Sequence, residues 1–245
     1  MDCCIVIPSR MDSTRFPGKP LVDLQGKPMV QWVWEAAMSS GVAERVVVAT
    51  PDDAILKACA NFGAEAIRTR ADHPSGTDRL AEVSHAVHAE VYVNVQGDEP
   101  LISPETIKTC AQPLLRDATI AMGSIYTRCA HQDVDNPAVV KVVTDQNGFA
   151  LYFSRHAIPF ARNPRPLEVK KHVGIYAYRK LALQSFAAWP VSPLEFAEGL
   201  EQLRFLENGV RIMMSEGAAS ELAIDTPEQA AEVRKILAGR RRRSG

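Results

Sequence analysis

The 245-residue chain contains 28 basic and 29 acidic side chains, so its formal net charge at pH 7 is −1. That balance argues against a protein that binds nucleic acid through a broad basic face. Hydrophobic residues make up 46% of the chain, which suits a globular enzyme; no apolar run predicts a membrane span, and we expect no secretory leader.

Strand-like and helix-like segments alternate through the first half of the chain. Apolar and β-branched runs predict strands over 3–8, 46–49 and 91–95. Apolar spacing and capping signals predict helices over 28–40, from an N-cap at Thr50 to 62, over 78–88, and from Ser103 onward. Such alternation is typical of a mainly parallel sheet with helices on both faces, whose ligands gather beyond the carboxyl ends of the strands.

The second half of the chain is less regular. We predict strands over 139–144, 150–154 and 173–178, a helix from the capping box at Ser192 to Glu207, and a last helix from Thr226. No repeat or linker divides the chain, so we expect one domain, 1–245, elaborated at about 126–180. The basic run Arg240–Arg243 falls in a tail, 239–245, that we expect to be disordered.

The cysteines bear on the cellular compartment. They stand at positions 3, 4, 59, 110 and 129, an odd number without the spacing of a zinc site. We therefore expect free thiols and a protein of the reducing cytoplasm.

The loop after the first predicted strand, residues 10–19, carries two arginines, a lysine, two hydroxyls and a glycine. Cations and backbone N–H groups at a sheet rim are what a polyphosphate requires, so this loop indicates a triphosphate site. It has neither the Walker pattern nor the dinucleotide glycine pattern. The alternative is a solvated basic surface loop.

Two aspartates are candidates for a metal site. Asp98 follows the strand that ends at Val95, and Asp225 precedes the predicted N-cap of the last helix. Mg²⁺ favours one or two carboxylates together with substrate phosphates. Taken singly, each aspartate is equally compatible with a turn or a helix cap.

Three further polar groups remain ambiguous from the residues alone. Segment 70–79 could border a nucleoside through Arg79 or simply cap the helix after it. His172 enters an apolar strand from which it could reach a ligand. Glu198 and Gln202, four residues apart, are expected on one helix face, where a solvated role is the alternative.

Taken together, these segments resemble the bacterial cytidylyltransferase family that makes CMP-Kdo, Kdo being 3-deoxy-D-manno-octulosonate. The resemblance runs from the first strand to the last helix. It rests on IPSR (7–10), STRFPGKPL (13–21), GKPM (26–29), SGTDR (75–79), VNVQGDEP (93–100), ALYFSR (150–155), KHVGIY (171–176), EGLEQLR (198–204) and IDTPE (224–228). Ser9 stands where alanine is usual, and the connection after Pro159 is short.

The resemblance implies a three-layer α/β/α nucleotidyltransferase fold, Rossmann-like with a mixed, mostly parallel sheet. It also implies a homodimer, Mg²⁺ dependence and the reaction of CTP with Kdo to give CMP-Kdo and pyrophosphate for lipopolysaccharide synthesis. Region 126–180 would then serve sugar binding and dimerisation, with no nucleic acid partner and no membrane insertion.

Site residues follow from the resemblance position by position. Catalytic roles fall to Arg10, Lys19, Asp98 and Asp225, the two aspartates being the metal ligands. Nucleotide contacts fall to Arg10, Ser13, Arg15, Lys19, Ser75, Gly76, Arg79, Gln96 and Asp98. Sugar contacts fall to Gln96, Arg155, His172, Tyr176, Glu198 and Gln202.

Two other functions stay open. A related sugar acid, such as 8-amino-3,8-dideoxy-manno-octulosonate, differs from Kdo by one group that one or two pocket residues could select. A non-catalytic nucleotide-binding interaction module is the alternative outside the enzymes. The presence of Arg10, Lys19, Asp98 and Asp225 argues against the second.

Overall fold

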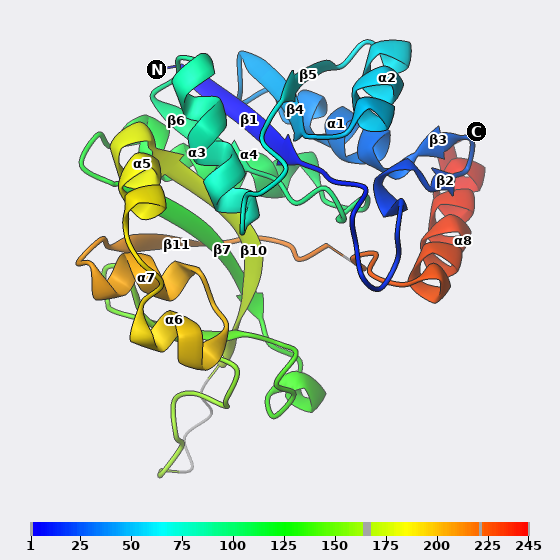
Figure 1. Cartoon of the computed structure of the whole chain (residues 1–245). Coiled ribbons are helices and arrows are strands. Elements are labelled where there is room, and N and C mark those ends of the chain that lie inside the picture. Colours follow the sequence, from blue (N-terminus) through cyan, green and yellow to red (C-terminus); the bar gives the residue numbers. More distant parts are fainter. Residues whose placement is uncertain (1, 164–167, 221, 245) are drawn as a thin grey trace.

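The computed structural model describes residues 2–163, 168–220 and 222–244. Its centre is a nine-stranded mixed sheet with the order β11-β7-β10-β6-β1-β4-β5, to which β8 and β9 are joined through β10 (Figure 1). The strands are β1 (Cys3–Pro8), β4 (Arg45–Thr50), β5 (Glu65–Arg68), β6 (Val91–Asn94), β7 (Met122–Arg128), β8 (Lys141–Thr144), β9 (Ala150–Ser154), β10 (Lys170–Arg179) and β11 (Ile212–Glu216).

Strand β1 shows how the sequence builds this sheet. It pairs in parallel with β4 on one side and β6 on the other. Because side chains alternate across a strand, Cys3, Ile5 and Ile7 enter one apolar cluster, whereas Cys4 and Val6 enter a second on the opposite face. Burial on both faces explains the uninterrupted apolar run.

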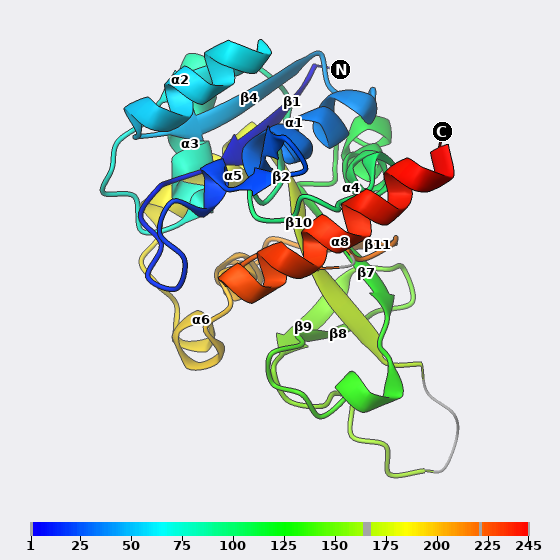
Figure 2. The same ribbon diagram turned by 90° about the vertical axis from the view of Figure 1, so that its right-hand side faces the viewer.

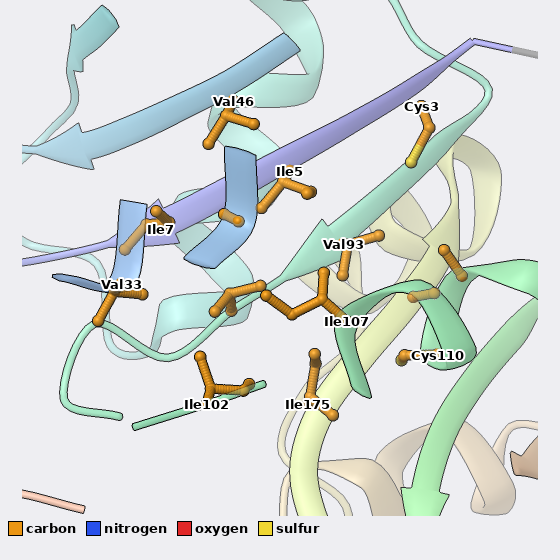
Figure 3. Packing of buried hydrophobic residues seen from close by; sticks show 14 of the residues in the cluster. Cys3, Ile5, Ile7, Val33, Val46, Val93, Ile102, Ile107, Cys110 and Ile175 are labelled. Carbon is orange, nitrogen blue, oxygen red and sulfur yellow. The ribbon is translucent and has the colours of Figure 1, made fainter. Parts of the chain in front are cut away.

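Helices cover both faces. Those of the first cluster are α1 (Met29–Ser39), α2 (Asp53–Phe62) and α4 (Pro104–Arg116). Those of the second are α3 (Gly76–Ala86), α5 (Lys180–Ala188) and α7 (Gln202–Glu207). Figure 3 shows the first cluster, where Ile7 of β1 lies near Val33 of α1, and Ile107 of α4 lies beside Val93 of β6.

The second half adds an antiparallel part. The long strand β10 pairs antiparallel with β6, β7 and β8, and β8 continues to β9, which Figure 2 places below the main sheet. Helix α6 (Pro193–Glu198) lies in this lower part next to α7 (Figure 1). None of the helices in the described ranges has the length and apolarity that a membrane crossing requires.

The last helix, α8 (Pro227–Ser244), packs on the opposite end of the molecule. It rests on a small hairpin of β2 (Asp23–Leu24) and β3 (Lys27–Pro28), which follows the short 3-10 turn η1 (Lys19–Leu21). A second short turn, η2 (His131–Asp133), lies between β7 and β8. Ala230, Val233 and Leu237 of α8 form a third apolar cluster with residues of the N-terminal third. The C-terminal helix is thereby held next to the loop after β1.

The α/β/α architecture is confirmed, as are both the strand–helix alternation of the first half and the stop of α2 at Gly63. Several elements had not been predicted, namely the strands β5, β7 and β11, the helix α5, the small hairpin of β2 and β3, and the turns η1 and η2. The mixed character of the sheet is confirmed as well, since β10 runs antiparallel to β6, β7 and β8. Helix α8 continues to Ser244, and the expected disorder of the tail 239–245 stays a prediction.

Two local predictions were wrong. The N-cap of α2 is Asp52, not Thr50, whose hydroxyl instead accepts the N–H of Asp52 at 3.2 Å. The predicted helix from Ser192 to Glu207 is two helices, because Gly199 adopts a left-handed φ of 62° and ends α6. Glu198 and Gln202 therefore do not share a face of one helix.

Candidate active site

A cavity of about 380 Å³ opens beyond the carboxyl ends of β1 and β6. Its walls come from the loop after β1, the N-terminus of α3, the turn after β6 and the start of α8. Of the predicted site residues it contains Arg10, Ser13, Arg15, Lys19, Ser75, Gly76, Arg79, Gln96, Asp98 and Asp225. Residues from the two ends of the chain thus line one cavity.

The loop after β1 is closed by its own backbone. The N–H of Gly18 donates to the carbonyl of Met11 at 2.9 Å, and the N–H of Met11 donates to Asp52 Oδ2 at 2.8 Å. Gly18 has a φ of 76°, in the left-handed region where a side chain is strained. This closure aims the basic side chains of the loop at the cavity.

Gly97 lets the turn after β6 approach the end of β1. A Cβ at this position would lie 2.6 Å from Ser9 Oγ and 2.7 Å from the carbonyl oxygen of Pro8. Only glycine fits there without displacement of the backbone. The close approach brings Gln96 and Asp98 to the rim where the basic loop begins.

Lys19 connects the two candidate metal ligands. Its Nζ donates to Asp98 Oδ2 at 2.8 Å, to Asp225 Oδ1 at 3.0 Å and to the carbonyl of Ile224 at 3.0 Å. Burial lowers the pKa of Lys19, but the two aspartates outweigh it and raise that pKa above its ordinary value. Because both carboxylates bind the same ammonium nitrogen, they lie close enough together to share one cation.

Three arginines add positive charge to the cavity in different ways. Arg10 is exposed, and Arg15 Nη2 forms an ion pair with Asp225 Oδ2 at 2.9 Å. Arg79 is buried, donating to Thr69 Oγ1 and to the carbonyl of Arg70. Burial and the nearby charge of Arg10 lower the pKa of Arg79. Arg79 therefore supplies charge and rigidity from beneath the surface.

The N-terminus of α3 faces the same cavity. Ser75 is its N-cap, and its Oγ accepts the N–H of Asp78 at 3.2 Å. Beside it, His73 lines the cavity while its Nε2 pairs with Glu82. No role had been predicted for His73, nor for Asp12, Thr14 and Met29, which also line the cavity.

A second group of predicted residues lies outside this cavity, around β10. His172 is buried, its Nε2 lies 3.0 Å from Ser124 Oγ, and its ring centroid lies 5.4 Å from that of Tyr176. Tyr176 donates to Gln202 Oε1 at 3.3 Å, while the buried Nε2 of Gln202 has no partner among the described residues. These three side chains form one polar cluster inside the second half.

The neighbours of His172 determine its protonation state and its tautomer. Burial lowers the pKa of His172 to about 3, so the ring is neutral near pH 7. The hydroxyl of Ser124 donates to the carbonyl of Ile175 at 2.8 Å and therefore accepts from His172 Nε2. The other ring nitrogen, Nδ1, is then a hydrogen-bond acceptor.

Arg155 and Glu198 are joined to each other. The Arg155 N–H donates to Glu198 Oε2 at 2.9 Å, and its Nε donates to the Glu198 carbonyl at 2.8 Å. Its Nη1 and Nη2 donate to the carbonyls of Pro137 and Gly199. All three guanidinium nitrogens are thus used within the protein, and Glu198 also accepts from Ser154 Oγ at 2.6 Å.

The residues present suit a divalent cation completed by substrate oxygens. In the described part of the chain, no cluster of three or more His, Cys, Asp or Glu could hold a metal ion. Asp98 and Asp225 nevertheless supply two carboxylates at one cationic position, the set that Mg²⁺ takes together with phosphates. A basic loop, a helix N-terminus and paired carboxylates on one cavity define an enzyme of the nucleotidyltransferase class.

Comparisons with known proteins agree with this class. The family model "Cytidylyltransferase" matches residues 4–212, and the chain belongs to that family. The 3-deoxy-manno-octulosonate cytidylyltransferase of Syntrophotalea carbinolica is 47% identical over 98% of this chain and 100% of its own length. That of Escherichia coli is 46% identical over 96% of this chain and 95% of its own.

A solved structure extends the likeness to three dimensions. It is that of CMP:2-keto-3-deoxy-manno-octonic acid synthetase complexed with CTP. The two chains are 44% identical and superpose with a TM-score of 0.95, over 98% of this chain and 100% of the other.

Proposed function

We propose that this protein transfers the CMP moiety of CTP to Kdo, giving CMP-Kdo and pyrophosphate. The observation that carries the proposal is the contact of Lys19 with both Asp98 and Asp225 on a cavity lined by the basic loop. The names and the CTP-bound state of the similar proteins support the choice of substrates.

The nucleotide occupies the cavity in this proposal. Arg10, Ser13, Arg15 and Lys19 hold the triphosphate and stabilise the charge that collects on departing pyrophosphate. Ser75 and Gly76, at the positive end of α3, border the nucleoside, with Arg79 beneath them. Gln96 stands between the nucleotide and the sugar acid.

The sugar acid lies toward the cluster of His172, Tyr176 and Gln202. Nδ1 of His172 accepts a hydrogen bond from a sugar hydroxyl, and Nε2 of Gln202, which has no partner within the described ranges, donates one. Arg155 and Glu198, which bind each other, are proposed as further contacts of the sugar acid.

Asp98 and Asp225 would hold Mg²⁺ in place of the contacts that they now make with Lys19. When bound, the ion would neutralise phosphate charge and lower the pKa of the attacking hydroxyl. The anomeric hydroxyl attacks the α-phosphorus in line as the bond to pyrophosphate breaks. In a partly enclosed site, repulsion between the triphosphate and the sugar carboxylate opposes their approach by roughly several kcal/mol. The positive charge of the basic loop offsets this repulsion.

Pyrophosphate release, measured with CTP, Mg²⁺ and a panel of sugar acids, tests the proposal. We expect the highest kcat/KM with Kdo. A higher value with 8-amino-3,8-dideoxy-manno-octulosonate would reassign the substrate. CTP binding without pyrophosphate release from any sugar acid would indicate a nucleotide-binding interaction module instead.

We further propose a cytoplasmic homodimer. All five cysteines are free and buried, which suits a reducing compartment. Leu151, Phe160 and Phe196, all in the second half, are 62%, 90% and 84% exposed, and they are apolar side chains that a second copy would cover. Light scattering after gel filtration distinguishes monomer from dimer.

A further inference from the structure

Lys141 is a lysine with no contact with solvent. Its exposed fraction is 0%, and it stands in β8 between β9 and β10. Its Nζ donates to the carbonyls of Asn136 at 3.0 Å, Val139 at 2.6 Å and Arg155. Three charge-assisted hydrogen bonds use all three ammonium protons, which compensates for removal of the charge from water.

These three carbonyls belong to two separate segments. Asn136 and Val139 lie in the loop before β8, whereas Arg155 follows β9. The Lys141 ammonium therefore joins the loop to the end of β9 across its own strand. A neutral side chain of similar length would remove this donor from all three oxygens; Asn136 would keep the N–H of Val139 at 3.1 Å, whereas the carbonyls of Val139 and Arg155 would lose their bond to the ammonium.

Each segment continues directly into the proposed sugar-binding part. Val140, next to Val139, accepts the backbone N–H of His172 at 2.9 Å. Arg155 holds Glu198 through its N–H and Nε, and its Nη2 reaches Gly199, where α6 ends shortly before Gln202. Lys141 thus binds Val139, the neighbour of the residue that holds His172, and it binds Arg155, which holds the end of α6 shortly before Gln202.

We propose that Lys141 is a positioning residue for sugar-acid binding: its buried ammonium fixes the 136–139 loop and Arg155, and through them His172 and the α6–α7 junction. This inference rests on the proposed function, because it takes His172 and Gln202 to be sugar contacts. Lys141 itself touches neither substrate. Its effect is therefore specific to the sugar half of the reaction.

The Lys141→Met variant tests this role. Its KM for the sugar acid is expected to rise at least about tenfold while its KM for CTP stays within about twofold, since small displacements of positioned groups cost up to about a hundredfold. Lys170→Met is the matched control, because Lys170 on β10 donates to the side-chain Oγ1 of Thr144 and covers the Tyr126 ring, with no bond to a backbone carbonyl among the described residues. The control should leave both KM values near those of the wild type.

Amide hydrogen exchange gives a readout independent of turnover. In Lys141→Met, the amides of His172 and Arg155 should exchange faster, whereas those of β1 should keep their wild-type protection. Equal sugar KM values in Lys141→Met and wild type, or unchanged exchange at both amides, would overturn the proposal. Absence of product from the wild type with every sugar acid would instead refute the proposed function and leave the exchange test valid.

A variant of intermediate severity, Lys141→Gln, distinguishes a positioning role from a simple loss of folding. Lys141→Gln keeps two N–H donors on a shorter side chain, so its sugar KM should lie between those of wild type and Lys141→Met. Loss of CTP binding and of the native circular dichroism spectrum in both variants would show that Lys141 only maintains the fold, and would overturn the proposal.

Discussion

The backbone N–H of Ile224 donates to the carbonyl oxygen of Asp98 at 2.8 Å. This bond joins the turn after β6 to the segment before α8 and sets Asp225 beside Asp98. The first turn of α8 is fixed in addition, because Gln229 Oε1 accepts the N–H groups of Asp225 at 2.7 Å and Thr226 at 3.0 Å. Packing of α8 therefore holds Asp225, which precedes the helix, at the wall of the cavity.

Removal of either carboxylate charge tests the metal assignment. Asp98→Asn and Asp225→Asn should each lower kcat at least about a hundredfold at saturating Mg²⁺, the scale of lost transition-state electrostatics. Asp53→Asn, a change at an exposed aspartate of α2, should keep wild-type turnover. Near-normal kcat in both site variants would remove the metal assignment.

Much of the N-terminal half was predictable because its signals are local. The β1 run is apolar throughout since both faces are covered, and Ser75 and Ser103 cap the predicted helices as expected. The meeting of Asp98 with Asp225 was predicted from the family resemblance. No periodicity in the chain links these two positions, since the contact depends on how α8 packs.

Prediction of the second half of the chain failed where tertiary contacts override the local sequence pattern. Leucine spacing favoured one helix from Ser192 to Glu207, but the left-handed Gly199 divides it, a stop signal that the sequence does contain. Strand β7 was missed although buried, because Gly123 and Ser124 interrupt its apolar pattern. The partners that occupy Arg155 are backbone carbonyls, which no residue pattern reveals.

Truncation of His172 should affect only the sugar. His172→Ala removes the proposed acceptor Nδ1, so KM for Kdo should rise about tenfold, the factor that corresponds to one hydrogen bond of about 1.4 kcal/mol. CTP affinity should remain unchanged, because His172 does not line the nucleotide cavity. Steady-state kinetics with each substrate varied in turn separates the two effects. A selective loss of CTP binding would contradict the assignment.

Burial of His172 also predicts a pH dependence of stability. Its pKa falls from 6.5 to about 3 on folding, so below pH 6.5 the unfolded chain binds a proton that the folded chain does not. The free energy of unfolding should therefore decrease as pH falls from 6.5 toward 3, by about 1.4 kcal/mol per pH unit from this group. Above pH 6.5 the contribution is complete.

Urea unfolding of wild type and His172→Asn at pH 7.5 and pH 5.0 measures this contribution. The wild type should lose about 2 kcal/mol more than the variant between the two values. His88→Asn, at an exposed histidine, should lose as much as the wild type. Equal losses in wild type and His172→Asn would contradict the burial of a neutral imidazole.

The ion pair between Arg204 and Glu195 should dominate the stability of the α6–α7 region. Both side chains are 8% exposed, and Arg204 Nε and Nη2 donate to Glu195 at 2.6 and 2.5 Å. Arg204 also stacks over the Phe186 ring at 3.9 Å. Arg204→Met would leave a carboxylate buried without its partner, so we expect a loss of about 3–5 kcal/mol in unfolding free energy.

The pair of Arg211 with Asp145, at 2.8 Å and with side chains that are 60% and 27% exposed, provides the more solvated comparison for this prediction. Arg211→Met should cost only about 0–1 kcal/mol, because solvent screens an exposed pair. Replacement of both Arg204 and Glu195 by methionine should cost less than the sum of the two single changes, since no unpaired charge then remains buried. Additive losses in that double-mutant cycle would mean that the two side chains stabilise the helices independently, through packing rather than through their charges.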